Sequence, residues 1–211
     1  MSVVEDVATR RMPLSPPDVY GPVFGPEAPV HQQILAWSTK ASEAVMTFMA
    51  SIYTNNHLEP RLVELIRLRI AFHNQCRTCM ATRNQESGVT EELVCSLERP
   101  EEAPDLTDAE KAALKLADLM SIDHFSLKDE HFERLHEFYT PEQIVELGVL
   151  IGGTLGMGRL TASWDIVENL PERFQKDRDS GFVTPWGEGD VLINSADMSG
   201  KTIHAPGIRA S

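Results

Sequence analysis

The strongest constraint on the fold is a helical periodicity that runs from residue 30 to residue 171. Apolar residues recur there at steps of three and four, which places them on one face of an α-helix. Thr140-Pro141-Glu142-Gln143 gives the clearest helix start, with an N-cap, a proline in the first turn and a glutamine three residues after the cap. We therefore predict an all-α helical bundle, with helices from about 31 to 52, from 60 to an interruption at 74–76, over 76–86, a short one that opens at 90–92, and further helices over 107–120, 126–139 and 140–166.

Both ends of the chain lack this periodicity. Six prolines fall within the first thirty residues, and proline fixes φ and removes a backbone donor. We predict an extended or irregular arm over 1–29 and a single helical domain over 30–171. Glycines and prolines also punctuate the chain after Pro171, so 172–211 is predicted as an irregular tail with one short strand pair.

The charge of the chain excludes several classes of partner. Lys and Arg number 19 against 32 Asp and Glu, for a formal net charge of −13. Such a chain is repelled by phosphate backbones and anionic lipid surfaces, so we expect neither nucleic acid nor membrane as a partner. The first residues lack an apolar signal segment, and the longest uncharged apolar run, 147–158, falls short of the roughly 20 residues that span a bilayer. We expect a cytoplasmic protein.

Two of the three cysteines form a Cys76-x-x-Cys79 pair, while Cys95 stands apart. Residues three apart share one helix face, so two sulfurs on a first turn lie close enough to bond. A helix N-terminus also lowers the pKa of a thiol there. These features favour a redox-active dithiol. The alternatives are half of a zinc site, although no second ligand pair of suitable spacing follows, and two inert buried cysteines. We expect no metal.

The combination of Glu64, an interval and the Cys76-x-x-Cys79 pair resembles the carboxymuconolactone decarboxylase superfamily, and specifically its AhpD-like branch. The stretch from Glu146 to Leu160 also resembles that family's C-terminal core helix, and the likeness covers about residues 30–170. The resemblance implies an AhpD-like helical bundle that assembles as a homo-oligomer, a trimer or hexamer. It also implies a dithiol–disulfide cycle that reduces hydroperoxides without a cofactor and needs an external dithiol reductant.

The resemblance also assigns roles to individual residues. Cys79 would be the peroxidatic nucleophile, and Cys76 the more exposed resolving cysteine that meets the reductant. Glu64 would belong to a proton relay. Arg83 stands where the family has a histidine, so its guanidinium would lie one helical turn from Cys79. It could stabilise a thiolate or bind an anionic substrate, but it could not accept a proton.

Two of these positions carry alternatives. Glu64 could pair with Arg61 or Arg67 at the surface, or it could be partly buried with the raised pKa that suits proton transfer. A histidine from elsewhere could complete the relay. However, a regular helix places His73 opposite Glu64, and His131 and His136 are expected on a solvated face.

Gly148, Gly152 and Gly156 recur at four-residue steps on one face of the last predicted helix. Because glycine destabilises a helix, such a face suggests that another helix packs very close to it. That helix could belong to the same subunit or to a neighbouring one.

These residues are compatible with three functions. The leading one is an AhpD-like thiol–disulfide oxidoreductase that reduces hydroperoxides at Cys76 and Cys79. The second is a carboxymuconolactone-decarboxylase-like lyase acting on a small carboxylate or lactone, with Arg83 binding the substrate carboxylate and the cysteines idle. The third is a non-enzymatic helical redox-sensor assembly that uses the disulfide as a switch.

Overall fold

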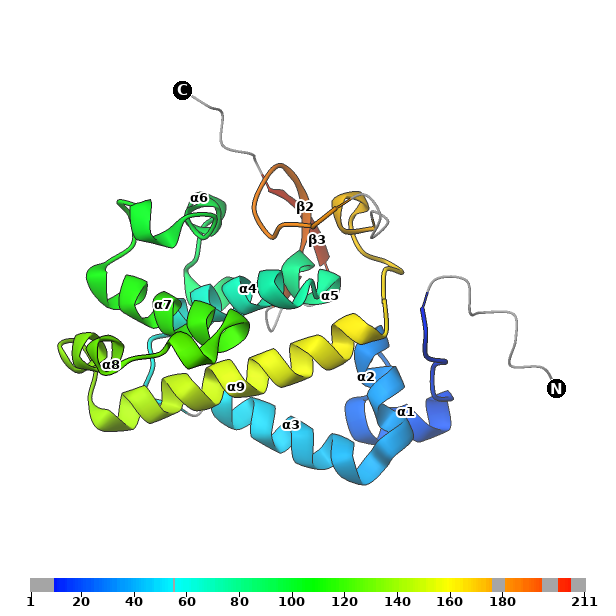
Figure 1. Ribbon diagram of the computed structural model, residues 1–211. Helices are drawn as coiled ribbons and strands as arrows, with labels where there is room; N and C mark the ends of the chain where they lie inside the picture. Colours follow the sequence, from blue (N-terminus) through cyan, green and yellow to red (C-terminus); the bar gives the residue numbers. More distant parts are fainter. Residues whose placement is uncertain (1–9, 55, 176–180, 195–200, 206–211) are drawn as a thin grey trace.

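The structure is a computed structural model that describes residues 10–54, 56–175, 181–194 and 201–205. Most of the described chain is helical, which confirms the predicted all-α class (Figure 1). The helices are α1 (Pro17–Phe24), α2 (Val30–Leu35), α3 (Thr39–Thr54), α4 (Pro60–Asn74), α5 (Arg77–Ala81), α6 (Glu91–Ser96), α7 (Asp108–Ile122), α8 (Asp129–His136) and α9 (Pro141–Ser163). The strands are β1 (Thr82–Asn84), β2 (Gly189–Asn194) and β3 (Lys201–Ala205).

Helix α4 lies at the centre of the bundle, packed against both α7 and α9 (Figure 1). Most of its residues are buried, and its apolar side chains form the middle of the main core. Leu147, Leu150 and Ile151 of α9 and Leu114 of α7 close over them. Helix α3 covers another side of α9. The helix that carries Glu64 is thus the most enclosed element of the fold.

The predicted helix starts are present as capping interactions. The Thr107 hydroxyl accepts a hydrogen bond from the Glu110 amide at 3.2 Å, and the Glu110 carboxylate accepts the Thr107 amide at 2.8 Å. Thr140 and Gln143 make the same reciprocal pair at the start of α9. These caps satisfy backbone donors that no helix can satisfy for itself, which explains why the starts were legible in the sequence.

The prediction of an irregular arm without helix is wrong over 17–24, where α1 forms. Pro17 lies in its first turn, where a missing donor costs nothing. Further towards the N-terminus, the Arg11 amide donates to the Trp164 carbonyl at 2.8 Å. This bond ties the arm to the chain just beyond the C-terminal end of α9. Residues 1–9 of the predicted arm lie outside the described residues.

The helix predicted over 76–86 is much shorter in the structure. Helix α5 ends at Ala81, and the next three residues form β1, which pairs in parallel with β2. Strand β2 pairs antiparallel with β3, which confirms the strand pair predicted in the tail. The helix ends early because residues more than a hundred positions away supply a strand partner, with Arg83 opposite Ile193. Local sequence carries no sign of that pairing.

The tail belongs to the core rather than lying outside it. A second apolar cluster combines residues beside the cysteine motif with Leu170, Phe174, Val191 and Ile193, and Cys79 packs against this cluster. Phe174 is completely buried. The predicted boundary at residue 172 therefore cuts through a packed unit.

The glycine face of α9 is uncovered in the described subunit. A Cβ atom added at Gly148, Gly152 or Gly156 would meet no described atom within 4 Å, so of the two alternatives for this face, close packing by a helix of the same subunit does not occur among the described residues. The close contacts occur instead at Gly153, where a Cβ would lie 2.7 Å from the Phe48 ring, and at Gly158, where it would lie 2.4 Å from Asn74 Nδ2. Packing against another subunit stays a prediction.

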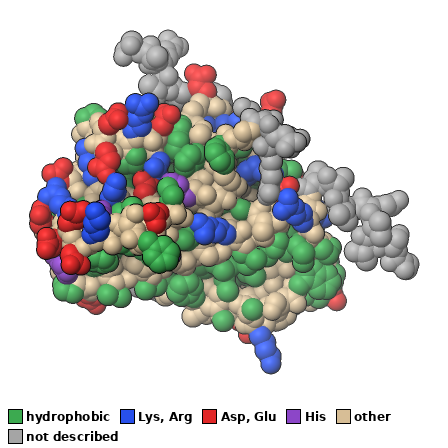
Figure 2. All heavy atoms as spheres, viewed as in Figure 1, with side chains coloured by type: hydrophobic (Ala, Val, Ile, Leu, Met, Phe, Trp, Pro, Cys, Tyr) green, Lys and Arg blue, Asp and Glu red, His purple; other side chains and the backbone are tan. Residues whose placement is uncertain are grey.

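Apolar side chains gather over α3 and α9, whereas charged side chains gather over α7 and α8 (Figure 2). Among the described residues, α9 is the one helix that is long and apolar enough to cross a membrane by length and composition. The core helix of a soluble protein can satisfy the same criterion.

Candidate functional site

Cys76 and Cys79 are joined by a disulfide, with their Cα atoms 5.2 Å apart. The prediction that the pair lies close enough to bond is thereby confirmed. Cys76 is the N-cap residue of α5 and is completely buried, while Cys79 is partly exposed. The expectation that Cys76 is the more exposed cysteine is therefore wrong. Burial follows from the turn that precedes Cys76, which places this residue inside the bend between α4 and α5.

That bend is fixed by Gln75 at the end of α4. Its backbone adopts the left-handed conformation with φ of 50°, which turns the chain out of the helix. The Gln75 side chain donates to the Val183 carbonyl at 3.1 Å and accepts the Val183 amide at 2.9 Å. The tail is thus bonded to the residue that immediately precedes Cys76.

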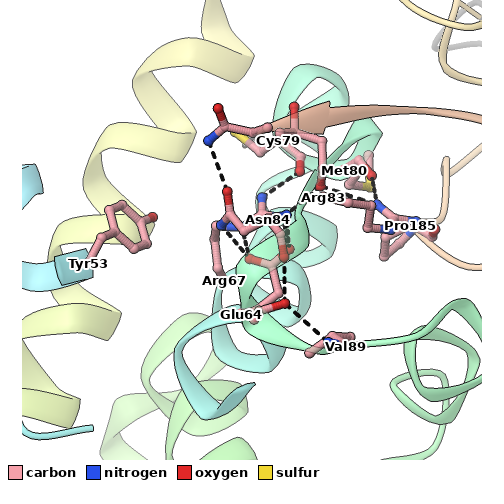
Figure 3. A network of polar contacts seen from close by, with 12 residues as sticks. Tyr53, Glu64, Arg67, Cys79, Met80, Arg83, Asn84, Val89 and Pro185 are labelled. Atoms are coloured by element: carbon pink, nitrogen blue, oxygen red, sulfur yellow. Dashed lines mark hydrogen bonds and ion pairs between the residues drawn. The ribbon is translucent and has the colours of Figure 1, made fainter. Parts of the chain in front are cut away.

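Glu64 and Arg67 form a buried ion pair beneath the cysteine motif (Figure 3). Arg67 donates from Nε and Nη2 to the two carboxylate oxygens at 2.7 and 2.6 Å. Asn84 donates to the same oxygens from its backbone amide at 3.0 Å and its side-chain amide at 2.6 Å. Glu64 therefore forms the ion pair with Arg67 that was one expectation for it, and it is also buried, which was the other.

Arg67 also holds the end of the cysteine helix. Its Nη1 donates to the Cys79 carbonyl at 2.7 Å, and its Nη2 donates to the Thr82 carbonyl at 2.7 Å. A short helix leaves its last carbonyls without intrahelical partners, and a guanidinium can satisfy two of them at once. The sequence motifs do not predict this role of Arg67, although the Glu64-x-x-Arg67 spacing on one helix face does indicate the ion pair.

The electrostatics of Glu64 differ from the expectation of a raised pKa. Burial does raise the pKa of this carboxyl, but Arg67 and the two Asn84 donors outweigh it and hold the pKa below its ordinary value. The carboxylate therefore stays charged at neutral pH. Its oxygens are occupied by four hydrogen bonds, so they have no direct approach to either sulfur.

The described hydrogen bonds of the Arg83 guanidinium go to oxygens and to neither sulfur, contrary to the role predicted for it. Arg83 is buried, and it donates to Glu91 at 2.7 and 3.1 Å, to the Met80 carbonyl at 2.7 Å and to the Pro185 carbonyl at 2.6 Å. Figure 3 shows its side chain directed toward Pro185. The reason is the early end of α5, because Arg83 belongs to β1 and a strand does not keep the helical direction.

The sequence model of the Carboxymuconolactone decarboxylase family matches residues 39–119, which include Glu64, both motif cysteines and Arg83. A protein of unknown function from Agrobacterium tumefaciens, for which an AhpD role in antioxidant defence has been suggested, is 27% identical. The match covers 63% of this chain and 94% of that one, with a TM-score of 0.55. The match to the family model over residues 39–119 and the likeness to this structure support a place for the chain in the carboxymuconolactone decarboxylase/AhpD-like superfamily.

Two further solved structures share the superfamily fold. One is an alkylhydroperoxidase AhpD core, an uncharacterized peroxidase-related protein from Ralstonia eutropha, at 16% identity, covering 80% of this chain and 95% of that one with a TM-score of 0.60. The other is a variant of the debrominase Bmp8 in complex with 2,3,4-tribromopyrrole, at 19% identity, covering 78% and 92% with a TM-score of 0.63. No curated protein matches the sequence. Fold membership therefore leaves the reaction open.

The superfamily's histidine position has no replacement among the described residues. None of the described histidines hydrogen-bonds to Cys76 or Cys79 (the nearest in sequence, His73, bonds through Nε2 to Asp118 at 2.6 Å). His124 and His136 are exposed, as expected for the latter. The described residues also contain no group of three or more His, Cys, Asp or Glu that could hold a metal ion.

Proposed function

We propose that this protein is a thiol–disulfide oxidoreductase that reduces hydroperoxides with the Cys76/Cys79 pair. The observation that supports this most directly is the bonded pair itself, set at the start of α5 with Cys79 partly exposed and its carbonyl held by Arg67. A dithiol carries the two electrons that peroxide reduction requires, so the chemistry needs no resident cofactor.

The cycle begins from the reduced pair. The Cys79 thiolate attacks the terminal oxygen of a hydroperoxide, the O–O bond breaks, and the alkoxide leaves as an alcohol after taking a proton. Cys79 is then a sulfenic acid. Cys76 attacks that sulfur, the S–O bond breaks, and the hydroxide leaves as water with the proton of the Cys76 thiol. The disulfide forms, and an external dithiol reduces it by exchange.

The difference in burial between the two cysteines supports Cys79 as the residue that meets both peroxide and reductant. Cys76 is completely buried, whereas Cys79 is partly exposed. Arg67 is a positioning residue that fixes the Cys79 carbonyl, and Glu64 keeps Arg67 in place. With Glu64 fully bonded, water supplies the proton that the alkoxide takes.

The proposal is tested by measuring the rate at which the full chain consumes peroxide with dithiothreitol as the reductant. Cys79→Ser should abolish turnover, and Cys76→Ser should leave a sulfenic acid on Cys79 that dimedone traps. Cys95→Ser is the matched control and should keep full activity, because Cys95 lies outside the bonded pair. Peroxide turnover that survives Cys79→Ser would refute the proposal.

The same variants separate the other two functions. A lyase should keep its activity when both motif cysteines are serine, but Arg83, the residue expected to bind its substrate carboxylate, is buried and bonded to Glu91. A redox sensor should form the disulfide with peroxide, but its turnover with excess reductant should be no faster than peroxide reduction by an ordinary free thiol. Sustained turnover that depends on Cys79 would set the enzyme apart from both.

We also propose that a second copy of the chain covers the uncovered face of α9. Val145, Val149 and Leu160 are among its exposed apolar side chains, and they lie beside the open glycine positions. An exposed apolar surface of this kind is typical of a subunit interface. Light scattering should give a multiple of the 23.5 kDa chain mass, and Val149→Arg should lower it. A monomer at micromolar concentration would contradict this proposal.

A further inference from the structure

A cavity of about 570 Å³ lies beside the cysteine motif. Four segments that are distant in sequence meet there: the N-terminal arm, the turn between α4 and α5, the last part of α9, and the start of the tail at residues 181–183. Its lining includes both neighbours of Cys76, namely Gln75 and Arg77. A molecule in this cavity would therefore lie against the segment that carries the disulfide.

Three arginines from three of these segments line the cavity: Arg11, Arg77 and Arg159. Arg77 forms an ion pair with Asp165. Arg159 donates to Asn74 Oδ1 at 3.2 Å and to the Ser121 carbonyl at 2.8 Å, and Arg11 donates to the Ser163 carbonyl at 3.3 Å. Within the described part of the chain, neither Arg11 nor Arg159 pairs with a carboxylate.

This arrangement runs against the charge of the molecule. The chain has a formal net charge of −13, and its other arginines near the motif, Arg67 and Arg83, are each neutralised by a glutamate. Two guanidinium groups held only by neutral oxygens therefore leave uncompensated positive charge in one hollow. A guanidinium is suited to bind a planar carboxylate through two parallel hydrogen bonds.

The rest of the lining combines apolar side chains with the polar residues Asn74, Gln75 and Ser163. Ala162, Val183 and Phe182 contribute to the walls, and the Phe182 side chain is 83% exposed. Ligand pockets typically measure about 300–1,000 Å³ and combine apolar walls with a few polar groups that orient the ligand. The volume and the lining of this cavity match that description.

We infer that this cavity binds a small organic carboxylate, with the carboxylate at Arg11 and Arg159 and the apolar body against Phe182 and Val183. Identifying this ligand as the substrate of the dithiol rests on the proposed function. The hydroperoxide would then carry a carboxylate held beside the turn between α4 and α5, and its peroxide group would extend from there to Cys79, the nucleophile of the proposed cycle. The binding site itself depends only on the cavity.

Calorimetry on the full chain tests the site with octanoate as the probe, and with octanol and inorganic phosphate as comparisons. Octanoate should bind at least about tenfold more tightly than either, because octanol lacks the charge and phosphate lacks the apolar body. Arg159→Gln should weaken octanoate binding by about tenfold and Arg11→Gln by a smaller factor. Arg99→Gln, which removes an exposed arginine beside Glu102, is the matched control and should change nothing.

Equal binding of octanoate and octanol would overturn the inference, as would phosphate binding as tight as octanoate. Arg159→Lys, which keeps the charge but loses the fork, guards against a misfolded Gln variant and should bind with intermediate affinity. The two proposals are separated by titrating octanoate into the chain with both motif cysteines changed to serine and by assaying peroxide turnover in the wild type. If the double variant binds octanoate but the wild type does not turn over peroxide, the proposed function is refuted and the carboxylate site stands.

Discussion

Two arginine–carboxylate networks lie on different faces of α4, and they differ in the number of basic side chains that bind the carboxylate. In the first, Arg67 is the one described cation bonded to Glu64, which also accepts two hydrogen bonds from the neutral Asn84, and Arg67 donates to the carbonyls of Cys79 and Thr82. In the second, Arg69 and His73 both donate to Asp118 of α7. The Glu64 side chain is 1% exposed, whereas Asp118 is 23% exposed.

The difference follows from what each network connects. The second joins two regular helices that already pack through the apolar core, so its polar contacts add to a contact that exists without them. The first holds the end of a five-residue helix, which has too few internal bonds to keep its own shape. The buried Glu64–Arg67 pair therefore lies where the backbone around the disulfide depends on side-chain hydrogen bonds to keep its shape.

The largest effect should come from Arg67→Met. This change leaves the Glu64 carboxylate buried without a cation and removes the donor of the Cys79 carbonyl, while the Thr82 carbonyl keeps only the Arg83 donor at 3.3 Å. The free energy of unfolding should therefore fall by about 3–5 kcal/mol. Urea denaturation of the oxidised protein measures it. The rate of disulfide re-formation with oxidised dithiothreitol should also fall, because Cys79 loses its anchor.

Arg69→Met is the matched control for that prediction. Asp118 keeps its bond to His73 and reaches solvent, so the loss of stability should be smaller and the rate of disulfide re-formation unchanged. If both variants slow re-formation equally, Arg67 has no special role in positioning Cys79.

The next effect tests the charge of Glu64. Glu64→Gln keeps the shape but places a neutral amide against Arg67 and the Asn84 donors, which should lower the free energy of unfolding by about 3 kcal/mol. Peroxide turnover per folded molecule should stay near the wild-type value, because four hydrogen bonds occupy the carboxylate oxygens and Glu64 does not act as a proton relay in the proposed cycle. A stable variant with lost turnover would restore Glu64 as a proton relay.

The sequence allowed the helical class, the helix starts and the pairing of the cysteines to be predicted, because caps and residues three apart are local features. The course of the chain after Cys79 could not be predicted in the same way. Thr82, Arg83 and Asn84 become a strand because β2 lies beside them, more than a hundred residues further along. The wrong prediction that Arg83 lies one helical turn from Cys79 follows from that one error. The burial of Cys76 also depends on distant residues, because the tail bonds to Gln75, the residue before it.

Acid titration separates the same carboxylates. The pKa of Glu64 is held below its ordinary value, so the stability it contributes is present above that value, about pH 4.5, and is lost as the pH falls through the lowered pKa. The difference in unfolding free energy between wild type and Glu64→Gln should therefore shrink as the pH falls from about 5 to about 3.

Asp118→Asn is the comparison for this titration. The pKa of Asp118 is also lowered, since its bonds to His73 and Arg69 outweigh its burial, so this variant should converge on the wild type over the same acidic range. A difference that grows toward low pH in either variant would show that the pKa of its carboxyl is raised, and not lowered, in the folded protein.

Arg83→His places the superfamily's histidine at its position in the sequence. The side chain there faces Glu91 and Pro185, so no gain of peroxidase activity is expected, and stability should fall by about 2 kcal/mol as the bonds of a buried guanidinium are lost. Peroxide assays and urea denaturation check the two parts. A clear gain in turnover would mean that residue 83 reaches the sulfurs during catalysis.

The smallest effect should come from His73→Phe on the shared network. Asp118 keeps both hydrogen bonds from Arg69, at 2.6 and 3.0 Å, and only the bond to His73 is removed. A single hydrogen bond contributes about 1 kcal/mol, and the phenylalanine ring fills the space of the imidazole, so the loss of stability should not exceed that value. A loss as large as that of Arg67→Met would mean that His73 cannot be replaced in holding Asp118, and that the two faces of α4 do not differ in redundancy.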